Sequence, residues 1–196
     1  MRYLLRILIV ATVAAALVTV ELSSRSGVAW RLITFTYQAN VLAAAFYTWA
    51  LLSVRAAARD GIRGAVVLYV LVAGLIWNVF LTDYSMGYTA ANILLHIAVP
   101  VLVLVDWLVV GATGRRVTWW QPMVWLIYPA AYALLALLVL NRAGRRAPYY
   151  FLDPQSVGTA VVAANVGLLA MLILLMGYAL SAGPRWRAGS SRSATS

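Results

Sequence analysis

Residues 90–112, AANILLHIAVPVLVLVDWLVVGA, decide the fold of this chain. The segment is almost wholly apolar, and at 1.5 Å per residue it is long enough to cross a hydrocarbon core about 30 Å thick. It also contains the only histidine of the chain, His96. An ionisable side chain at membrane depth is costly unless it faces a protein interior, so His96 is a candidate functional residue.

The rest of the chain repeats this apolar pattern. Hydrophobic residues make up 64% of the sequence and charged residues 10%, and the mean hydropathy of +0.89 is typical of integral membrane proteins. We therefore predict an all-α integral membrane protein, a compact bundle of six transmembrane helices over residues 1–182 with no soluble domain. A disordered cytoplasmic tail is predicted over residues 183–196, which are rich in glycine, serine and arginine. The predicted spans are 3–22, 29–54, 64–82, 90–112, 118–140 and 156–181.

Arginine positions predict the orientation. All fifteen basic residues are arginines, and ten of them flank the spans on the side of the N-terminus. The positive-inside rule places that side in the cytoplasm, so both termini are expected there. The five arginines on the other side are Arg25, Arg31, Arg142, Arg145 and Arg146.

Composition also excludes several functional classes. The formal net charge is +10, but the arginines sit at span ends rather than on one basic face, so we do not expect nucleic-acid binding. The chain has no cysteine, which excludes disulfides and thiolate metal sites. One histidine and five dispersed acidic residues predict no metal site, and we expect no cofactor. The oligomeric state is left open.

Topology assigns a depth to His96. The fourth span enters from the extracytoplasmic side near Ala90, so His96 lies about 9 Å below that surface. The second span enters from the same side near Ala29, which places Thr36 about 10 Å deep. Asn78 lies within about one turn of the same surface at the end of the third span. Polar side chains are therefore expected to gather in the outer half of the bundle.

Helical spacing adds a second constraint around His96. Asn92 lies four residues before His96 and so shares its face of the helix. Pro100 lies four residues after His96 and has no backbone N–H to donate to the His96 carbonyl, so a kink and a released acceptor are expected beside the imidazole. The same residues would also serve as structural hydrogen bonds between membrane helices, and both interpretations stay open.

The chemistry of the remaining groups favours an activated hydroxyl. Threonine is a poor nucleophile at its own pKa and becomes competent when a neighbouring imidazole accepts its proton. Thr36 and His96 match this requirement in type and depth. Asp106 lies about 15 Å further along the helix than His96 and is expected to make a helix contact at the inner end.

Four short motifs carry a family resemblance. The sequence resembles a group of bacterial six-span membrane proteins that is similar to the eukaryotic androgen-induced and androgen-dependent membrane threonine hydrolases. The resemblance covers most of the chain at low identity. The motifs are Thr36-Tyr37-Gln38-Ala39-Asn40, His96 followed by Pro100 and Asp106-Trp107, Trp125-Leu126-Ile127-Tyr128-Pro129, and Pro148-Tyr149-Tyr150-Phe151-Leu152-Asp153-Pro154.

The resemblance implies an intramembrane hydrolase of fatty acid esters of hydroxy fatty acids, in a bacterial plasma membrane. It places the nucleophile on Thr36 and the histidine on His96. The family threonine stands three residues before the asparagine, whereas Thr36 stands four before Asn40, so Thr34 is kept as a second candidate nucleophile.

The sequence therefore predicts a threonine-dependent lipid-ester hydrolase whose partners are membrane lipids or a fatty acid ester. Asn40 and Asn92 are candidates to orient His96 or to stabilise the oxyanion. The alternative is a non-catalytic membrane protein whose polar cluster binds lipid or packs helices. Candidate substrate contacts are Arg31, Asn78 and Tyr128.

Overall fold

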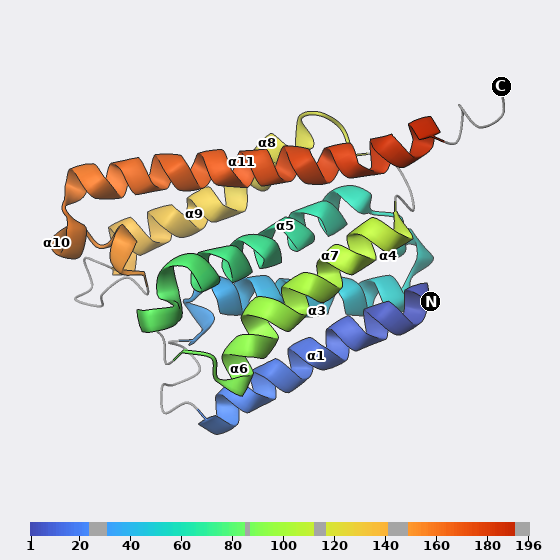
Figure 1. The fold of residues 1–196 in the computed structure, drawn as a ribbon, viewed down its shortest axis with the longest axis horizontal. Coiled ribbons are helices and arrows are strands. Elements are labelled where there is room, and N and C mark those ends of the chain that lie inside the picture. Colours follow the sequence, from blue (N-terminus) through green and yellow to red (C-terminus); the bar gives the residue numbers. More distant parts are fainter. Residues whose placement is uncertain (24–30, 85–86, 112–116, 141–148, 191–196) are drawn as a thin grey trace. The chain divides into compact units, whose positions relative to one another are not determined.

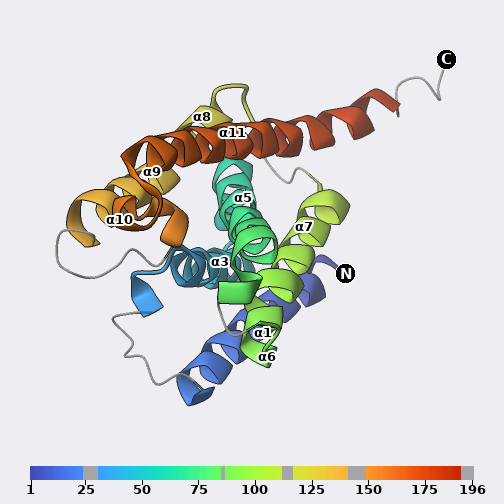
Figure 2. The ribbon, with the colours of Figure 1, turned by 60° about the vertical axis from the view of Figure 1, so that its left-hand side comes forward.

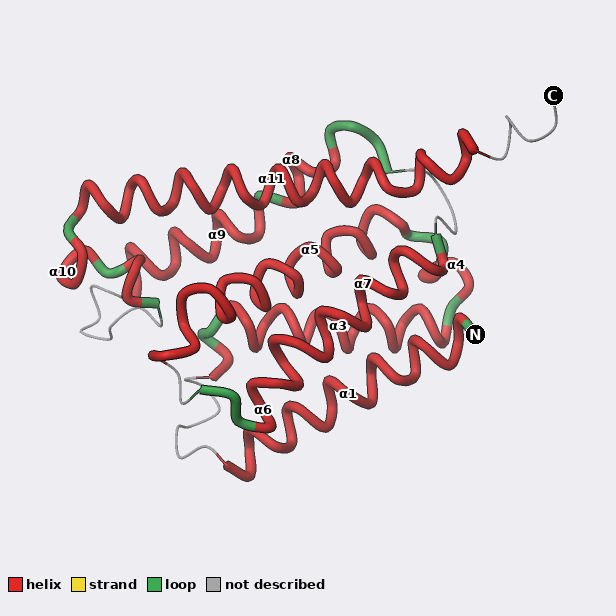
Figure 3. Tube along the Cα trace, in the orientation of Figure 1, coloured by secondary structure: helices red, strands yellow, loops and turns green. Residues whose placement is uncertain are grey.

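The structure is a computed structural model that describes residues 1–23, 31–84, 87–111, 117–140 and 149–190. Across these ranges the regular elements are all helices, with no strand, so the predicted all-α class is confirmed (Figure 3). The chain divides into two compact units. The first consists of Met1–Thr118 with Leu180–Ser196, and the second of Trp119–Ala179.

Five helical segments are long and apolar enough to cross a membrane, which is consistent with an integral membrane protein. A sixth helix, α3 (Phe35–Leu52), lies within the span predicted at 29–54 and has 18 residues. Thr36, Gln38 and Asn40 in its first two turns make it more polar than the others. The five apolar segments are Arg2–Ser23, Asp60–Leu81, Ala90–Val110, Gln121–Leu138 and Thr159–Ala182.

The first unit is built around four helices: α1 (Arg2–Ser23), α3, α5 (Asp60–Ile76) and α7 (Val99–Val110). Each helix contacts the next, and α7 contacts α1, so the four close into a ring (Figures 1 and 2). Successive helices run in opposite directions in Figure 1. This is the arrangement of an up-down-up-down four-helix bundle, in which side chains from facing helices can form a site.

Local sequence signals explain where these helices begin. Thr34 caps α3, because its side-chain oxygen accepts a hydrogen bond from the backbone N–H of Tyr37. Thr89 does the same for α6 (Ala90–Ile93) through the N–H of Asn92. Ser53 both ends α3 and caps the short helix α4 (Val54–Ala57).

Two stretches of this unit are π-helical rather than α-helical: η1 (Trp77–Leu81) after α5 and η3 (Leu94–Ala98) before α7. In η3 the N–H of Val99 donates to the carbonyl of Leu94, five residues earlier. Pro100 follows directly and cannot continue the ordinary pattern of helical hydrogen bonds. Such π-segments occur frequently at functional sites, and η3 contains His96.

The second unit carries shorter helices followed by one long helix. Asp153 caps α10 (Pro154–Val157), and Gly158 follows it with φ of 85°, a conformation that favours glycine. The other elements are η2 (Thr82–Tyr84) in the first unit and, in the second, α8 (Gln121–Trp125), α9 (Ile127–Leu135), η4 (Ala136–Leu140) and η5 (Tyr150–Leu152). The long helix α11 (Thr159–Ser190) begins in the second unit, and its residues from Leu180 onward are counted with the first.

The helix α11 extends through Ser190 and so includes the first residues of the segment in which the sequence predicts a disordered tail. A growing helix gains one backbone hydrogen bond for each residue that it fixes, so it can extend without apolar packing. Residues 191–196 lie outside the described residues.

Candidate functional site

The His96 carbonyl is released by Pro100, as the sequence predicts, and the structure supplies its partner. The Nδ2 atom of Asn78, at the end of the third predicted span, donates to the His96 carbonyl at 3.1 Å and to the Gly74 carbonyl at 2.8 Å. An acceptor left without a donor among apolar groups is costly, and the Asn78 amide removes that cost. Asn78, a candidate substrate contact, therefore makes a hydrogen bond between α5–η1 and η3.

The backbones of α5 and the His96 segment approach each other closely at Gly74. A Cβ atom at this position would lie 2.8 Å from the His96 carbonyl oxygen and 2.9 Å from Cγ of Pro100. Only glycine leaves room for this contact, because the space is already filled by backbone and a proline ring. The position of His96 is thus fixed by direct contact between two helices.

The imidazole of His96 is held by aromatic stacking. It lies parallel to the indole of Trp77, with ring centroids 4.6 Å apart and an interplanar angle of 12°. The ring of Tyr88 packs edge-on against the indole of Trp77, with ring centroids 5.3 Å apart. The backbone of Ala73 also lies beside the imidazole. The ring is therefore positioned by α5 and η1 together.

One nitrogen of this ring has no hydrogen-bond partner among the described residues. His96 is 6% exposed, and its Nδ1 atom is buried without a hydrogen-bond partner in the described part of the chain. Buried polar atoms are nearly always paired, and an unpaired one in a native protein calls for an explanation such as a catalytic role or an absent water. His96 is therefore a rigidly held imidazole with an available ring nitrogen.

The two candidate nucleophiles differ in how their hydroxyls are used. Thr34 donates to the Arg31 carbonyl at 2.8 Å and accepts from the Tyr37 N–H at 3.3 Å, so its oxygen serves the start of α3. Thr36, two residues later, is half-buried, and its hydroxyl has no hydrogen-bond partner among the described residues. The helix that carries Thr36 contacts the π-segment η3 that carries His96.

The two candidate oxyanion residues have different surroundings. Asn40 is fully buried and its Nδ2 donates to the Thr36 carbonyl at 2.9 Å, while its Oδ1 has no partner among the residues that the structure describes. Asn92 donates from Nδ2 to the Gly87 carbonyl at 2.8 Å, in the loop before its own helix. Asn40 thus faces the bundle interior and Asn92 ties down a loop. Their roles in orienting His96 or stabilising an oxyanion stay predictions.

Arg31, a candidate substrate contact at the outer end, has a partner inside the protein. Its guanidinium forms an ion pair with Glu21 on α1, and the hydroxyl of Tyr37 donates to the same carboxylate at 3.1 Å. Arg31 is buried, whereas the Glu21 side chain is partly exposed. These contacts link the end of α1 to the start of α3.

Tyr128 belongs to the second unit, where it is half-buried in α9. Its role as a substrate contact stays a prediction. In the same unit, Nδ2 of Asn165 on α11 donates to the Phe151 carbonyl in η5 at 2.9 Å. This bond holds the start of α11 against the turn that precedes it.

A second polar cluster occupies the opposite end of the four-helix bundle, and the sequence did not predict it. Its centre is the fully buried carboxylate of Asp106 on α7. Arg63 of α5 donates to Asp106 Oδ2 from Nε at 2.9 Å, and the Tyr47 hydroxyl of α3 donates to the same oxygen at 3.0 Å. Nε of Arg6 on α1 lies 3.8 Å from Oδ1. The expected helix contact of Asp106 is therefore confirmed, and it joins all four helices of the ring.

Arg63 makes further contacts that keep its charge in place. Nη1 donates to the Gly111 carbonyl at 2.7 Å and lies 3.4 Å from Oδ1 of Asp60. The guanidinium also lies over the ring of Trp107, 5.1 Å from its centroid. A buried charge is tolerated only when it is paired and hydrogen-bonded, and Arg63 meets both conditions.

The cluster was not predicted, because arginines near span ends such as Arg6 and Arg63 were interpreted only as markers of orientation. Both side chains are fully buried. A signal was available: Arg6 lies inside the first apolar span, and Asp60 and Arg63 share a helix face at a spacing of three residues.

No group of three or more histidine, aspartate or glutamate residues in the described ranges could hold a metal ion. Comparisons with protein-family models, with curated proteins and with solved structures found no match.

Proposed function

We propose that the chain crosses a bacterial plasma membrane six times, with α3 as the second crossing and both termini in the cytoplasm. Five apolar helices of sufficient length support most of these crossings. The ring of antiparallel helices supports the crossing by α3, because α3 packs between α1 and α5 along the same bundle. The excess of arginines on the side of the N-terminus supports the orientation.

We further propose that the protein is an intramembrane lipid-ester hydrolase with Thr36 as the nucleophile and His96 as the general base. The observation that carries this proposal is the buried Nδ1 of His96, which has no partner among the described residues and is free to accept a proton. The Thr36 hydroxyl is likewise unused among these residues, whereas the Thr34 hydroxyl caps α3. These facts support Thr36 over Thr34.

The reaction would proceed in two balanced steps. The imidazole of His96 accepts the hydroxyl proton while Thr36 Oγ1 attacks the ester carbonyl, and the proton then passes to the departing alkoxide to release an alcohol. Water, deprotonated by the same imidazole, next attacks the acyl-threonine and releases the carboxylic acid and Thr36. In this proposal the second N–H of the Asn40 amide, one turn after Thr36, donates to the substrate carbonyl during both steps, while the first stays on the Thr36 carbonyl.

A non-catalytic role is the second candidate, and one observation favours it. The amides of Asn40, Asn78 and Asn92 all donate to backbone carbonyls of the protein itself. The Asn78 bond joins two helices, and hydrogen bonds of that kind hold membrane helices together without any chemistry. On this alternative the polar cluster packs helices or binds an intact lipid.

Turnover separates the two candidates. The purified full chain is offered a panel of lipid esters and a hydroxyl-directed covalent probe. The hydrolase proposal expects turnover and labelling that Thr36→Ala and His96→Gln both reduce by at least about 100-fold, the usual size of a general-base contribution.

The matched control is Thr34→Asn, which removes the hydroxyl and keeps a side chain that caps helices well. It is expected to retain activity. Tryptophan fluorescence and thermal unfolding confirm that each variant is folded. Wild type that neither turns over nor labels contradicts the proposal, and so does full activity in Thr36→Ala.

A further inference from the structure

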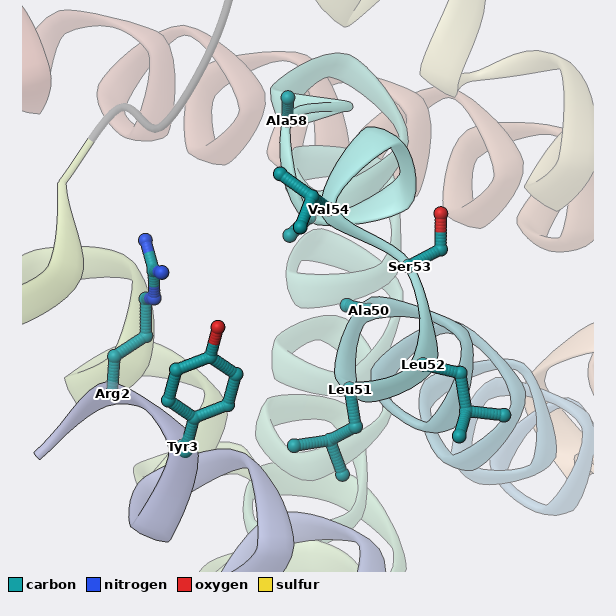
Figure 4. A pocket seen from close by; sticks show the side chains of 9 residues that line it. Arg2, Tyr3, Ala50, Leu51, Leu52, Ser53, Val54 and Ala58 are labelled. Carbon is teal, nitrogen blue, oxygen red and sulfur yellow. The ribbon is translucent and has the colours of Figure 1, made fainter.

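A cavity of about 110 Å³ opens between the first turn of α1 and the end of α3 (Figure 4). A single water needs only about 10–15 Å³ of such a cavity, so there is room for a polyatomic group. It lies at the same end of the bundle as the Asp106 cluster. Its lining residues are Arg2, Tyr3, Ala50, Leu51, Leu52, Ser53, Val54, Ala57 and Ala58.

The polar groups of the lining offer positive charge and donors. Arg2 and Tyr3 lie side by side on α1, and their polar ends extend in the same direction (Figure 4). No carboxylate lines the cavity, and Arg2 has no carboxylate partner within the described ranges. The hydroxyl of Ser53 points away and caps α4. Among the described residues, the site therefore has a cation and no anion.

A second arginine strengthens this positive character. Arg6 lies one turn beyond Arg2, is fully buried, and donates from Nη1 to the carbonyl of the lining residue Ala50 at 3.4 Å. Its Nε and Nη2 atoms have no hydrogen-bond partner in the described part of the chain. Its nearest carboxylate, Asp106 at 3.8 Å, is already bound by Arg63. The first two turns of α1 thus carry two arginines, and the one carboxylate near them, Asp106, is shared with Arg63.

The rim of the cavity is apolar. The lining residues Leu52 and Val54 are 83% and 82% exposed. Such large apolar side chains are unfavourable in water and favourable beside acyl chains. A free inorganic anion would use only the arginine end of the site. An occupant with both an anionic group and an acyl chain would use all of it.

We propose that this cavity binds the phosphate of an anionic phospholipid of the phosphatidylglycerol type. Arg2 and Tyr3 donate to the phosphate oxygens, and Leu52 and Val54 contact the acyl chain. In the proposed topology this end of the bundle faces the cytoplasmic leaflet, where anionic lipids attract basic residues. The site is separate from Thr36 and His96, and it does not depend on hydrolysis.

Binding is measured on the purified full chain in neutral detergent, as the rise of the unfolding temperature with added short-chain phosphatidylglycerol. Short-chain phosphatidylcholine and inorganic phosphate serve as parallel arms. We expect a saturable rise with phosphatidylglycerol and little with the other two. A charge-assisted hydrogen bond contributes enough that Arg2→Gln should weaken the apparent affinity by about tenfold or more.

The matched control is Arg55→Gln, which removes the same charge from an exposed residue next to the lining and should change the affinity by less than about twofold. A second variant, Ala58→Leu, fills the cavity without changing charge and should abolish binding. Equal binding of phosphatidylcholine or inorganic phosphate overturns the proposal. Equal losses in Arg2→Gln and Arg55→Gln, or full binding in Ala58→Leu, overturn it as well.

Discussion

At the scale of single residues, Gly74 determines how near α5 can come to His96. The His96 carbonyl and the Pro100 ring occupy the space where a Cβ at position 74 would stand. That close approach in turn brings Asn78, one turn further along, within reach of the same carbonyl. The missing side chain of Gly74 therefore permits the hydrogen bond that satisfies the acceptor released by Pro100.

Gly74→Ala is expected to destabilise the protein by about 1–3 kcal/mol, because the added methyl group overlaps backbone that cannot move aside without shifting a helix. Gly167→Ala on α11 is the matched control, since no atom of the described residues lies within 4 Å of a Cβ there. Alanine is favoured over glycine in helices, so the control should be neutral or slightly stabilising. Thermal unfolding in detergent compares the two, and equal effects would refute the close-contact argument.

At the scale of the elements, the Asp106 cluster fastens one end of the four-helix ring. Each helix contributes at least one polar group: Arg6 from α1, Tyr47 from α3, Arg63 from α5 and Asp106 itself from α7. Removing one partner of a buried ion pair leaves the other charge uncompensated. Replacing both partners with apolar residues leaves no buried charge. The cluster therefore specifies which helices are neighbours more than it adds net stability.

Asp106→Asn should destabilise the protein by about 3–5 kcal/mol, because it leaves Arg6 and Arg63 without their shared carboxylate. The double variant Arg6→Met with Asp106→Leu removes one positive and one negative charge and leaves Arg63 beside Asp60. We expect it to be more stable than Asp106→Asn. Asp83→Asn, at an exposed residue, serves as the control and should lie within about 0.5 kcal/mol of wild type.

Tryptophan fluorescence during denaturant unfolding measures these differences, since Trp107 lies against Arg63. A double variant that is less stable than Asp106→Asn would show that the pair contributes through its own attraction rather than through charge balance.

For the whole molecule, the features that can be predicted from the sequence are those that depend on residues close together along the chain. The helices follow from apolar segments and their capping residues, and the released His96 carbonyl follows from Pro100 four residues later. Contacts between distant residues are different: Arg6 and Asp106 are a hundred positions apart, and only the order of helices around the ring brings them together. An arginine inside an apolar span can pair with a buried acid or extend to the interface, so the position of Arg6 signals an ion pair but does not identify Asp106 as the partner.

The crossing by α3 is the one to test, because α3 is more polar than the five other proposed spans. The chain has no cysteine, so single cysteines report their side of the membrane without background labelling. Ser23 and Ala58 stand before and after α3 and are the sites to compare. If α3 crosses, a membrane-impermeant maleimide added outside intact cells should label Ser23→Cys and leave Ala58→Cys unlabelled.

Asp83→Cys adds an independent test, because two crossings separate it from Ser23, and it should label like Ser23→Cys. A chain in which α3 does not cross would instead place Ala58 on the side of Ser23 and Asp83 on the opposite side. The two topologies therefore predict opposite labelling of Ala58→Cys and of Asp83→Cys. The six-crossing pattern is also required by the proposed chemistry, since Thr36 can reach the depth of His96 only if α3 enters the membrane from the same side as the fourth span.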